Sequence, residues 1–203
     1  MFRVVLIAIW TWMSLASAAV ADPLSKIQER LTNNPIVCAV FSQSKSLRAL
    51  TRPLLSRGKF VFVAGKGVLW QVREPFPAQV LVKRDALIKW SDDGRPQRVS
   101  FGQTPIFKAL SNVFLATFSG DINGLRDTFF IKADELSSPW RLTLTPRNQA
   151  FAKIITAVRV TGDRFVNELV IEEARGDKTH IKFSGVDTET CQLGEAEKGY
   201  LAH

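Results

Sequence analysis

The chain has 203 residues, with 27 Lys or Arg against 19 Asp or Glu, which gives a formal net charge of +8 at pH 7. This length suits one domain with a substantial apolar core, and 46% of the residues are hydrophobic. The basic residues are scattered without a dense run, so the composition favours a solvated surface. An attraction to anionic membrane surfaces or acidic partners is the second interpretation of this charge.

Residues 1–21 have the pattern of a cleavable secretory signal. Arg3 and the amino terminus form a short positive start, an apolar run follows from Val4 to Leu15, and Ala19-Val20-Ala21 is a small-x-small cleavage pattern. We expect cleavage after Ala21, which leaves residues 22–203 as one domain outside the cytoplasm, where nucleic acid is not a partner. The alternative is an uncleaved membrane anchor, for which the apolar run is short.

The first half of this domain predicts one helix followed by short strands. Asp22-Pro23 suits a helix start and Asn33-Asn34-Pro35 its end. The apolar residues on one face of this helix are Leu24, Ile27 and Leu31. Dense β-formers then predict strands, with Lys66-Gly67 and Asp92-Asp93-Gly94 as turn signals. These strands are 37–45, 59–64, 68–72, 79–83, 87–90 and 98–101.

The middle of the chain predicts a helix that is apolar on more than one side. Thr104-Pro105 suits an N-cap and a first helical residue, residues 106–118 follow, and Gly120 can end the helix. Its polar stripe is narrow and consists of Lys108, Ser111 and Asn112. A surface helix normally has a narrower apolar face, so this helix needs apolar contacts around most of its circumference.

The last third returns to alternating strands. They are 128–132, 140–145, 154–160, 165–172 and 179–183. Gly162-Asp163 and Gly176-Asp177 separate the last three as hairpin turns. Alternation places Ile154, Thr156, Val158 and Val160 on one face, and likewise Phe165, Asn167, Leu169 and Ile171. The whole pattern predicts an antiparallel meander of roughly ten strands, which normally curls or closes.

Cys38 and Cys191 are the only cysteines and lie near the two ends of the expected domain. In an oxidising compartment such a pair more often bridges than stays free, so we expect a disulfide, with two buried thiols as the alternative. No metal site is expected, because only His180 and His203 could join the cysteines and the spacing matches no zinc pattern.

Motifs of enzymes are absent from the sequence, which contains no phosphate-binding glycine loop, nucleophile elbow or metal-binding helix pattern. His180 alternates with Ile181 on a strand and suits a solvated position, while Glu172-Glu173 suits a charged cluster at a strand end. We therefore expect no enzymatic activity and no cofactor. A hydrolase that uses His180 is the least favoured alternative.

Apolar side chains exceed what a small core needs. The sequence contains 14 Phe and only 1 Tyr, so most of its aromatic rings have no polar group. Each ring taken alone suits an ordinary β core. Together with a curled sheet and the apolar helix 105–118, they predict an apolar pocket covered by that helix.

The ordered series of short motifs resembles the outer-membrane lipoprotein carrier family (LolA-like), specifically its shorter branch, over nearly all of residues 22–203. The motifs that support the resemblance are Phe41-Ser42-Gln43, Arg52-Pro53-Leu54, Ser56-Arg57-Gly58-Lys59-Phe60, Gly67-Val68-Leu69-Trp70, Glu74-Pro75-Phe76, Leu144-Thr145-Pro146-Arg147, Gly162-Asp163 and Gly176-Asp177. The segment Val63-Ala64-Gly65-Lys66-Gly67 does not supply the arginine that contacts the lid in this family.

The resemblance implies an unclosed antiparallel β-barrel of about ten or eleven strands, mainly β with helices (α+β), whose concave face is covered by helices. It also implies a non-enzymatic, monomeric periplasmic carrier. Members of the family take acylated lipoproteins from an inner-membrane exporter and deliver them to an outer-membrane acceptor. The shorter branch is associated with lipid-like products. For this chain, the expected function is to bind such acyl chains and move them toward the outer membrane.

The expected lining of the lipid-binding cavity consists of apolar residues from four strands and the helix. They are Phe41, Phe60, Phe62, Trp70, Leu81, Phe107, Leu110, Phe114 and Phe118. A one-residue error in strand register would invert the face to which each strand residue belongs. The alternative function is an envelope sensor or protein-interaction module that uses the same fold to bind a peptide or protein partner.

Overall fold

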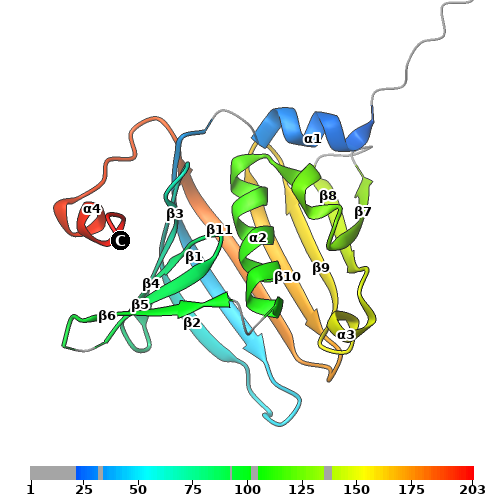
Figure 1. Cartoon of the computed structure of the whole chain (residues 1–203), viewed down its shortest axis with the longest axis horizontal. Helices are drawn as coiled ribbons and strands as arrows, with labels where there is room; N and C mark the ends of the chain where they lie inside the picture. Colours follow the sequence, from blue (N-terminus) through cyan, green and yellow to red (C-terminus); the bar gives the residue numbers. More distant parts are fainter. Residues whose placement is uncertain (1–21, 32–33, 92, 102–104, 135–138) are drawn as a thin grey trace, which may run out of the picture.

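A single antiparallel sheet of eleven strands dominates the fold, in the order β6-β5-β4-β3-β2-β1-β11-β10-β9-β8-β7 (Figure 1). The computed structural model describes residues 22–31, 34–91, 93–101, 105–134 and 139–203. The predicted signal peptide and the predicted N-cap Thr104 lie outside these ranges. The strands are β1 (Ile36–Ser46), β2 (Leu54–Val63), β3 (Gly67–Glu74), β4 (Ala78–Val82), β5 (Ala86–Trp90), β6 (Pro96–Ser100), β7 (Phe129–Asp134), β8 (Trp140–Pro146), β9 (Ile155–Gly162), β10 (Val166–Glu173) and β11 (Lys178–Asp187).

The strand order explains why the sheet is unclosed, as predicted. β1 to β6 follow one another from the centre of the sheet to one edge, and β7 to β11 return from the other edge. β1 and β11 pair at the centre, with Phe41 opposite Phe183. The chain must therefore cross from the β6 edge to the β7 edge. The helix α2 (Pro105–Ser119) and the short 3-10 helix η2 (Ile122–Leu125) make this crossing.

The two predicted helices are confirmed. In α1 (Pro23–Leu31) the carboxylate of Asp22 accepts a hydrogen bond from the Leu24 amide at 3.2 Å, and the predicted apolar face is buried. Gly120 follows α2 with φ of 77°, the left-handed conformation that ends helices. Figure 1 shows α2 in front of the sheet and α1 across one end of it. None of the described helices is long and apolar enough to cross a membrane.

Two short helices were not predicted. α3 (Gln149–Ala152) joins β8 to β9, and the side chain of Asn148 caps it by accepting hydrogen bonds from two backbone amides. α4 (Glu195–Tyr200) follows β11. Both are too short to show a helical repeat of apolar residues, which was the signal that identified α1 and α2.

Because β9 and β10 pair irregularly, some of their side chains lie on the opposite face of the sheet from the one that simple alternation predicted. The register shifts between Val166 and Glu168 and again between Glu172 and Glu173. The strand residues that face the inner cluster are therefore Ile155, Val158, Val160, Val166, Leu169 and Ile171. Ile154 and Thr156 are exposed and Phe165 is half-buried, so the predicted common faces are wrong in those members. A bulge moves every later side chain to the opposite face, and alternation alone cannot detect it.

Apolar side chains pack on both faces of the sheet. The face that contacts α2 carries the larger group, which we call the inner cluster. The opposite face of β2 to β5 carries the outer cluster, whose buried members are Val61, Val63, Leu69, Leu81, Ile88 and Leu201. The two clusters alternate along β2, since Phe60 and Phe62 face inward while Val61 and Val63 face outward.

The segment after β11 covers the outer cluster. A disulfide joins Cys38 of β1 to Cys191 with a Cα–Cα distance of 5.8 Å, and Tyr200 packs beside Trp90 with ring centroids 4.6 Å apart. Lys59 Nζ lies 2.6 Å from the carboxylate of Glu197 in α4. The carboxy-terminal residues are thus fixed on the outer face, and His203 packs against Trp90.

Candidate functional site

The helix α2 supplies the side chains that fill the inner face of the sheet. Its buried residues include Val113 and Phe118, and Leu110, Phe114 and Leu115 are half-buried against the inner cluster. The predicted polar stripe is only partly exposed to solvent. Lys108 is exposed, whereas Ser111 is only 5% exposed. As the sequence indicated, apolar contacts surround most of the helix.

Phe60 of β2 lies at the centre of an aromatic cluster between α2 and the sheet. Its ring centroid is 4.3 Å from that of Phe118 and 5.1 Å from that of Phe183. Trp70 of β3 meets Phe60 edge-on at 6.0 Å. These rings come from β2, β3, β11 and α2, so the cluster joins both halves of the sheet to the crossing helix.

Trp70 extends the aromatic cluster toward β1 and toward Phe114, one turn before Phe118 in α2. Its ring centroid lies 3.9 Å from that of Phe41 and 5.8 Å from that of Phe114. Gly58 makes room for this arrangement, because a Cβ there would lie 2.9 Å from the Phe41 ring and collide with the Gln71 carbonyl oxygen. The absence of a side chain at Gly58 therefore allows Phe41 to lie flat on β2.

The inner site contains almost no polar chemistry. The buried polar side chains of the described residues are Ser111, Thr117 and Glu197, and Glu197 lies on the outer face beside Lys59. The Thr117 hydroxyl donates its hydrogen bond to the Val113 carbonyl within α2. Within the described part of the chain no three potential ligands gather around a metal position. This site suits an aliphatic or aromatic ligand without charge.

Seven of the nine predicted lining residues meet at this inner site. They are Phe41, Phe60, Phe62, Trp70, Leu110, Phe114 and Phe118. Leu81 belongs instead to the outer cluster, because it pairs with Leu69 and both side chains point away from α2. Phe107 is 46% exposed at the start of α2. Phe183 was not among the predicted residues, although alternation with Ile181 on β11 was a signal that could have identified it.

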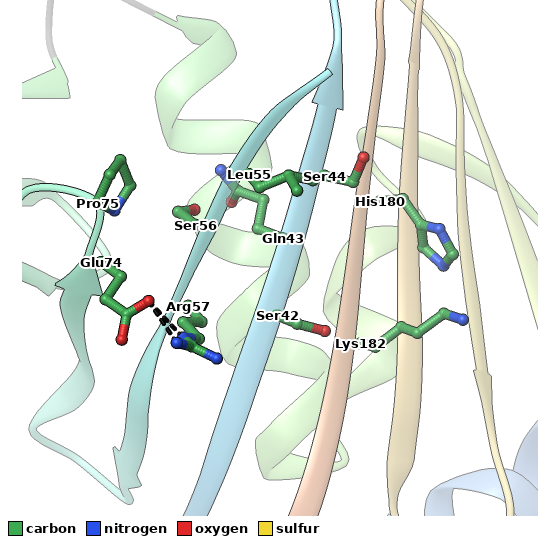
Figure 2. A pocket seen from close by; sticks show the side chains of 10 residues that line it. All are labelled: Ser42, Gln43, Ser44, Leu55, Ser56, Arg57, Glu74, Pro75, His180 and Lys182. Atoms are coloured by element: carbon green, nitrogen blue, oxygen red, sulfur yellow. Dashed lines mark hydrogen bonds and ion pairs between the residues drawn. The ribbon is translucent and has the colours of Figure 1, made fainter. Parts of the chain in front are cut away.

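The outer face carries a pocket of about 570 Å³ that lies across β1, β2, β3 and β11 and is lined mainly by residues with polar or charged side chains (Figure 2). Arg57 pairs with Glu74 at 2.6 Å, and the ring of His180 pairs with the Glu168 carboxylate. Ser44 lies directly across the strand pair from His180. Among the described residues no hydrogen bond joins Ser44 to His180, whose ring pairs with Glu168.

A second ion pair on the outer face has a clear electrostatic consequence. The Arg159 guanidinium donates a hydrogen bond to Glu172, and Lys178 Nζ lies 3.7 Å from the same carboxylate oxygen. The Arg159 hydrogen bond holds the pKa of Glu172 below its usual range, against the opposing effect of burial. This pair stabilises the β9–β11 surface and faces away from the inner site.

Comparisons with known proteins agree with this architecture. Residues 16–199 match the family described as outer membrane lipoprotein carrier protein LolA-like. No curated protein matches the sequence. A LolA superfamily protein from Nitrosomonas europaea is 13% identical, with a TM-score of 0.50 over 86% of this chain and 94% of that chain. A putative outer membrane lipoprotein-sorting protein domain from Vibrio parahaemolyticus is 11% identical, with a TM-score of 0.48 over 89% and 97%. The likeness to the Nitrosomonas protein shows the fold alone.

Proposed function

The chain belongs to the LolA-like family of outer membrane lipoprotein carrier proteins, and we propose that it is a non-enzymatic carrier of acyl chains in the periplasm. Its cargo is the acyl part of a lipoprotein or of a lipid-like product, which it moves toward the outer membrane. The observation that supports this proposal is the aromatic cluster in which α2 packs on the inner face of the sheet.

The contacts of α2 suit an exchange with lipid. Phe114 and Phe118 join the helix to the sheet through ring contacts with Trp70 and Phe60. Ring contacts are not directional in the way that backbone hydrogen bonds are, so an acyl chain can replace them with packing of similar strength. The helix can then move outward while its own backbone hydrogen bonds stay intact.

Hydrophobic burial explains why a carrier is needed. Each methylene group of an acyl chain that leaves water contributes about 0.8 kcal/mol, so a chain of about sixteen carbons does not cross an aqueous space unaided. The protein's own aromatic rings occupy the inner face, and cargo must displace their contacts in order to bind. The net affinity for cargo is therefore lower than it would be for an empty cavity. This competition allows release to an acceptor.

The proposed route requires a domain that is free of the membrane. Cleavage of the predicted signal after Ala21 would release residues 22–203 into the periplasm as a monomer. An inner-membrane exporter would supply the cargo and an outer-membrane acceptor would receive it. If residues 1–21 stay attached, the protein would act as a fixed lipid-binding subunit.

Native mass spectrometry tests the proposal directly. The protein is expressed from its full sequence in a bacterial host, purified by gentle extraction and sprayed without denaturation. We expect additional masses that correspond to bound fatty acids, phospholipids or acylated peptides. A protein that is always empty, and that binds no fatty acid or phospholipid added to it, contradicts the proposal. An empty protein that retains a stable protein partner in pull-downs would instead support the sensor or interaction module.

A further inference from the structure

One end of the sheet combines exposed apolar side chains with positive charge. It consists of the β1–β2 hairpin, residues 47–55, and the β3–β4 turn, residues 75–77, and we call it the hairpin end. In Figure 1 the hairpin, drawn in cyan, projects beyond the other strands on the side away from α1. The sequence from Arg30 to Arg73 contains eight Lys or Arg and no acidic residue. The hairpin lies in the middle of this basic stretch.

The apolar side chains of the hairpin end are unusually exposed. Leu50 is 48% exposed at the hairpin, Leu54 51%, Leu55 65%, and Phe76 in the neighbouring turn 81%. Isolated exposed apolar residues are common, but a group at two adjacent turns indicates a contact surface. Leu50 and Phe76 lie in the two turns, and Leu54 and Leu55 are the first residues of β2.

Strand pairing places the two turns next to each other. Arg57 pairs with Glu74 across β2 and β3, so the residues before Arg57 and after Glu74 extend toward the same end of the sheet. Leu55 of β2 and Pro75, which directly follows β3, both line the outer pocket (Figure 2). Phe76 directly follows Pro75 in the same turn.

The charges of the hairpin end are available to a partner. Arg48 and Arg52 are exposed, and among the described residues neither forms an ion pair. The acidic groups nearby already have partners: Glu74 pairs with Arg57, and a carboxylate oxygen of Asp177 accepts a hydrogen bond from the Arg48 backbone amide at 2.7 Å. That last bond involves only the backbone of Arg48, and the residue is exposed.

We propose that the hairpin end docks on an anionic phospholipid bilayer. Arg48 and Arg52 would lie at the phosphate groups, while Leu50, Leu54 and Leu55 enter the boundary between headgroups and acyl chains. Guanidinium groups beside projecting apolar side chains match the two layers of a bilayer surface, with anionic groups above hydrocarbon. An acidic protein partner would offer the charge but would need a complementary pocket for each projecting side chain.

Vesicle sedimentation tests this docking surface separately from cargo binding. The protein is produced from the full sequence, and its amino terminus is determined by mass spectrometry before use. Binding is measured to vesicles of phosphatidylethanolamine with phosphatidylglycerol and to vesicles of phosphatidylcholine alone. We expect binding to the anionic vesicles that weakens as salt is added, and little binding to the neutral ones.

Two pairs of variants locate the contact. Arg48→Ser with Arg52→Ser should weaken binding to anionic vesicles about 25-fold, since each cation near such a surface contributes about fivefold. The matched control, Lys66→Ser with Arg84→Ser, removes the same charge from exposed turns at the other end of β2 to β5. Leu50→Ser should also weaken binding, whereas Val99→Ser, at a residue 40% exposed on the edge strand β6, should not.

Two results would overturn the docking proposal. One is wild-type protein that binds anionic and neutral vesicles equally or binds neither. The other is a loss of binding in the Lys66 and Arg84 variant as large as in the Arg48 and Arg52 variant, which would mean that net charge alone is responsible. The lipid content found by native mass spectrometry should be the same in all these variants, so failure of the docking surface and failure of the carrier function are distinguishable.

Discussion

Phe118 of α2 lies against Phe60 of β2, with ring centroids 4.3 Å apart and ring planes inclined by 39°. Both rings also contact Phe183 of β11. The centroid of the Phe183 ring lies 5.2 Å from that of Phe118 and 5.1 Å from that of Phe60. One helix residue therefore contacts strands from both halves of the sheet. The two halves pair with each other through β1 and β11, and this contact joins the crossing helix to both of them at the inner face.

Replacing Phe118 by alanine should lower the free energy of unfolding by about 3–5 kcal/mol, because a buried ring is lost and a cavity remains. The variant Phe107→Ala is the matched control, since the same change is made on the same helix at a side chain 46% exposed. It should change the free energy by about 0.5 kcal/mol or less. Urea unfolding measures both values, and equal losses would show that Phe118 has no special part in closing the helix.

Trp70→Ala should reduce the fraction of protein that carries acyl lipid, because this ring joins Phe41 and Phe114 at the inner site. The loss of such an apolar contact corresponds to an affinity about tenfold lower or more. Leu81→Ala is the control, since Leu81 is fully buried in the outer cluster and its loss destabilises without touching the inner face. Native mass spectrometry of the folded fractions compares the two. Lipid lost equally from both variants contradicts the placement of the site.

Removal of the disulfide with Cys38→Ala and Cys191→Ala should lower the free energy of unfolding. The bond closes a loop between residues separated by 153 positions, which corresponds to about 5 kcal/mol in the chain-entropy description. The segment that covers the outer cluster should also loosen, so trypsin should cut faster after Lys198, whose side chain is 57% exposed. Unfolding in urea and timed proteolysis check the two effects. Unchanged stability and unchanged cleavage would mean that Lys59–Glu197 and the apolar contacts hold this segment without the disulfide.

The Arg159–Glu172 pair should make the free energy of unfolding fall as the pH is lowered into the acid range. The pKa of Glu172 is lowered in the folded protein, so the folded state binds this proton less readily than the unfolded chain. The resulting stabilisation is complete above the ordinary pKa near 4.5 and is lost as the pH falls through the lower, folded value. Glu172→Gln should therefore be less stable than the wild type near neutral pH, and the two should converge in acid. Glu189→Gln changes an ion pair that is largely exposed and should have little effect at any pH.

The elements that the sequence predicted correctly are those whose signals are local. The apolar spacing of Leu24, Ile27 and Leu31 and the stop at Gly120 each lie within a few residues, and both were found where expected. β2 begins earlier than predicted, at Leu54, because Pro53 and Gly58 weaken the local strand pattern. α4 escaped prediction because its position depends on distant partners, chiefly Lys59 and the disulfide to Cys38.

In the candidate site, too, the residues identified from local sequence patterns were placed correctly, and those whose position depends on distant contacts were not. Aromatic residues at alternating positions of β2 identified Phe60 and Phe62, since burial on one face of a strand repeats every second residue. Leu81 was placed on the wrong face because a shift of one residue reverses every side chain, and the register is set by pairing with Leu69 on β3. Phe107 is apolar by sequence, yet it is exposed where α2 begins.

The sequence by itself determined that this protein is a mainly antiparallel β domain with one strongly apolar helix, because composition and periodicity are properties of neighbouring residues. Only the tertiary structure decided that α2 crosses between the two edges of the sheet and that Phe118 meets Phe60 and Phe183. Those contacts join residues far apart in the chain, and the faces of the side chains on β9 and β10 likewise depend on bulges between these two strands. They depend on the packing of the whole sheet at once.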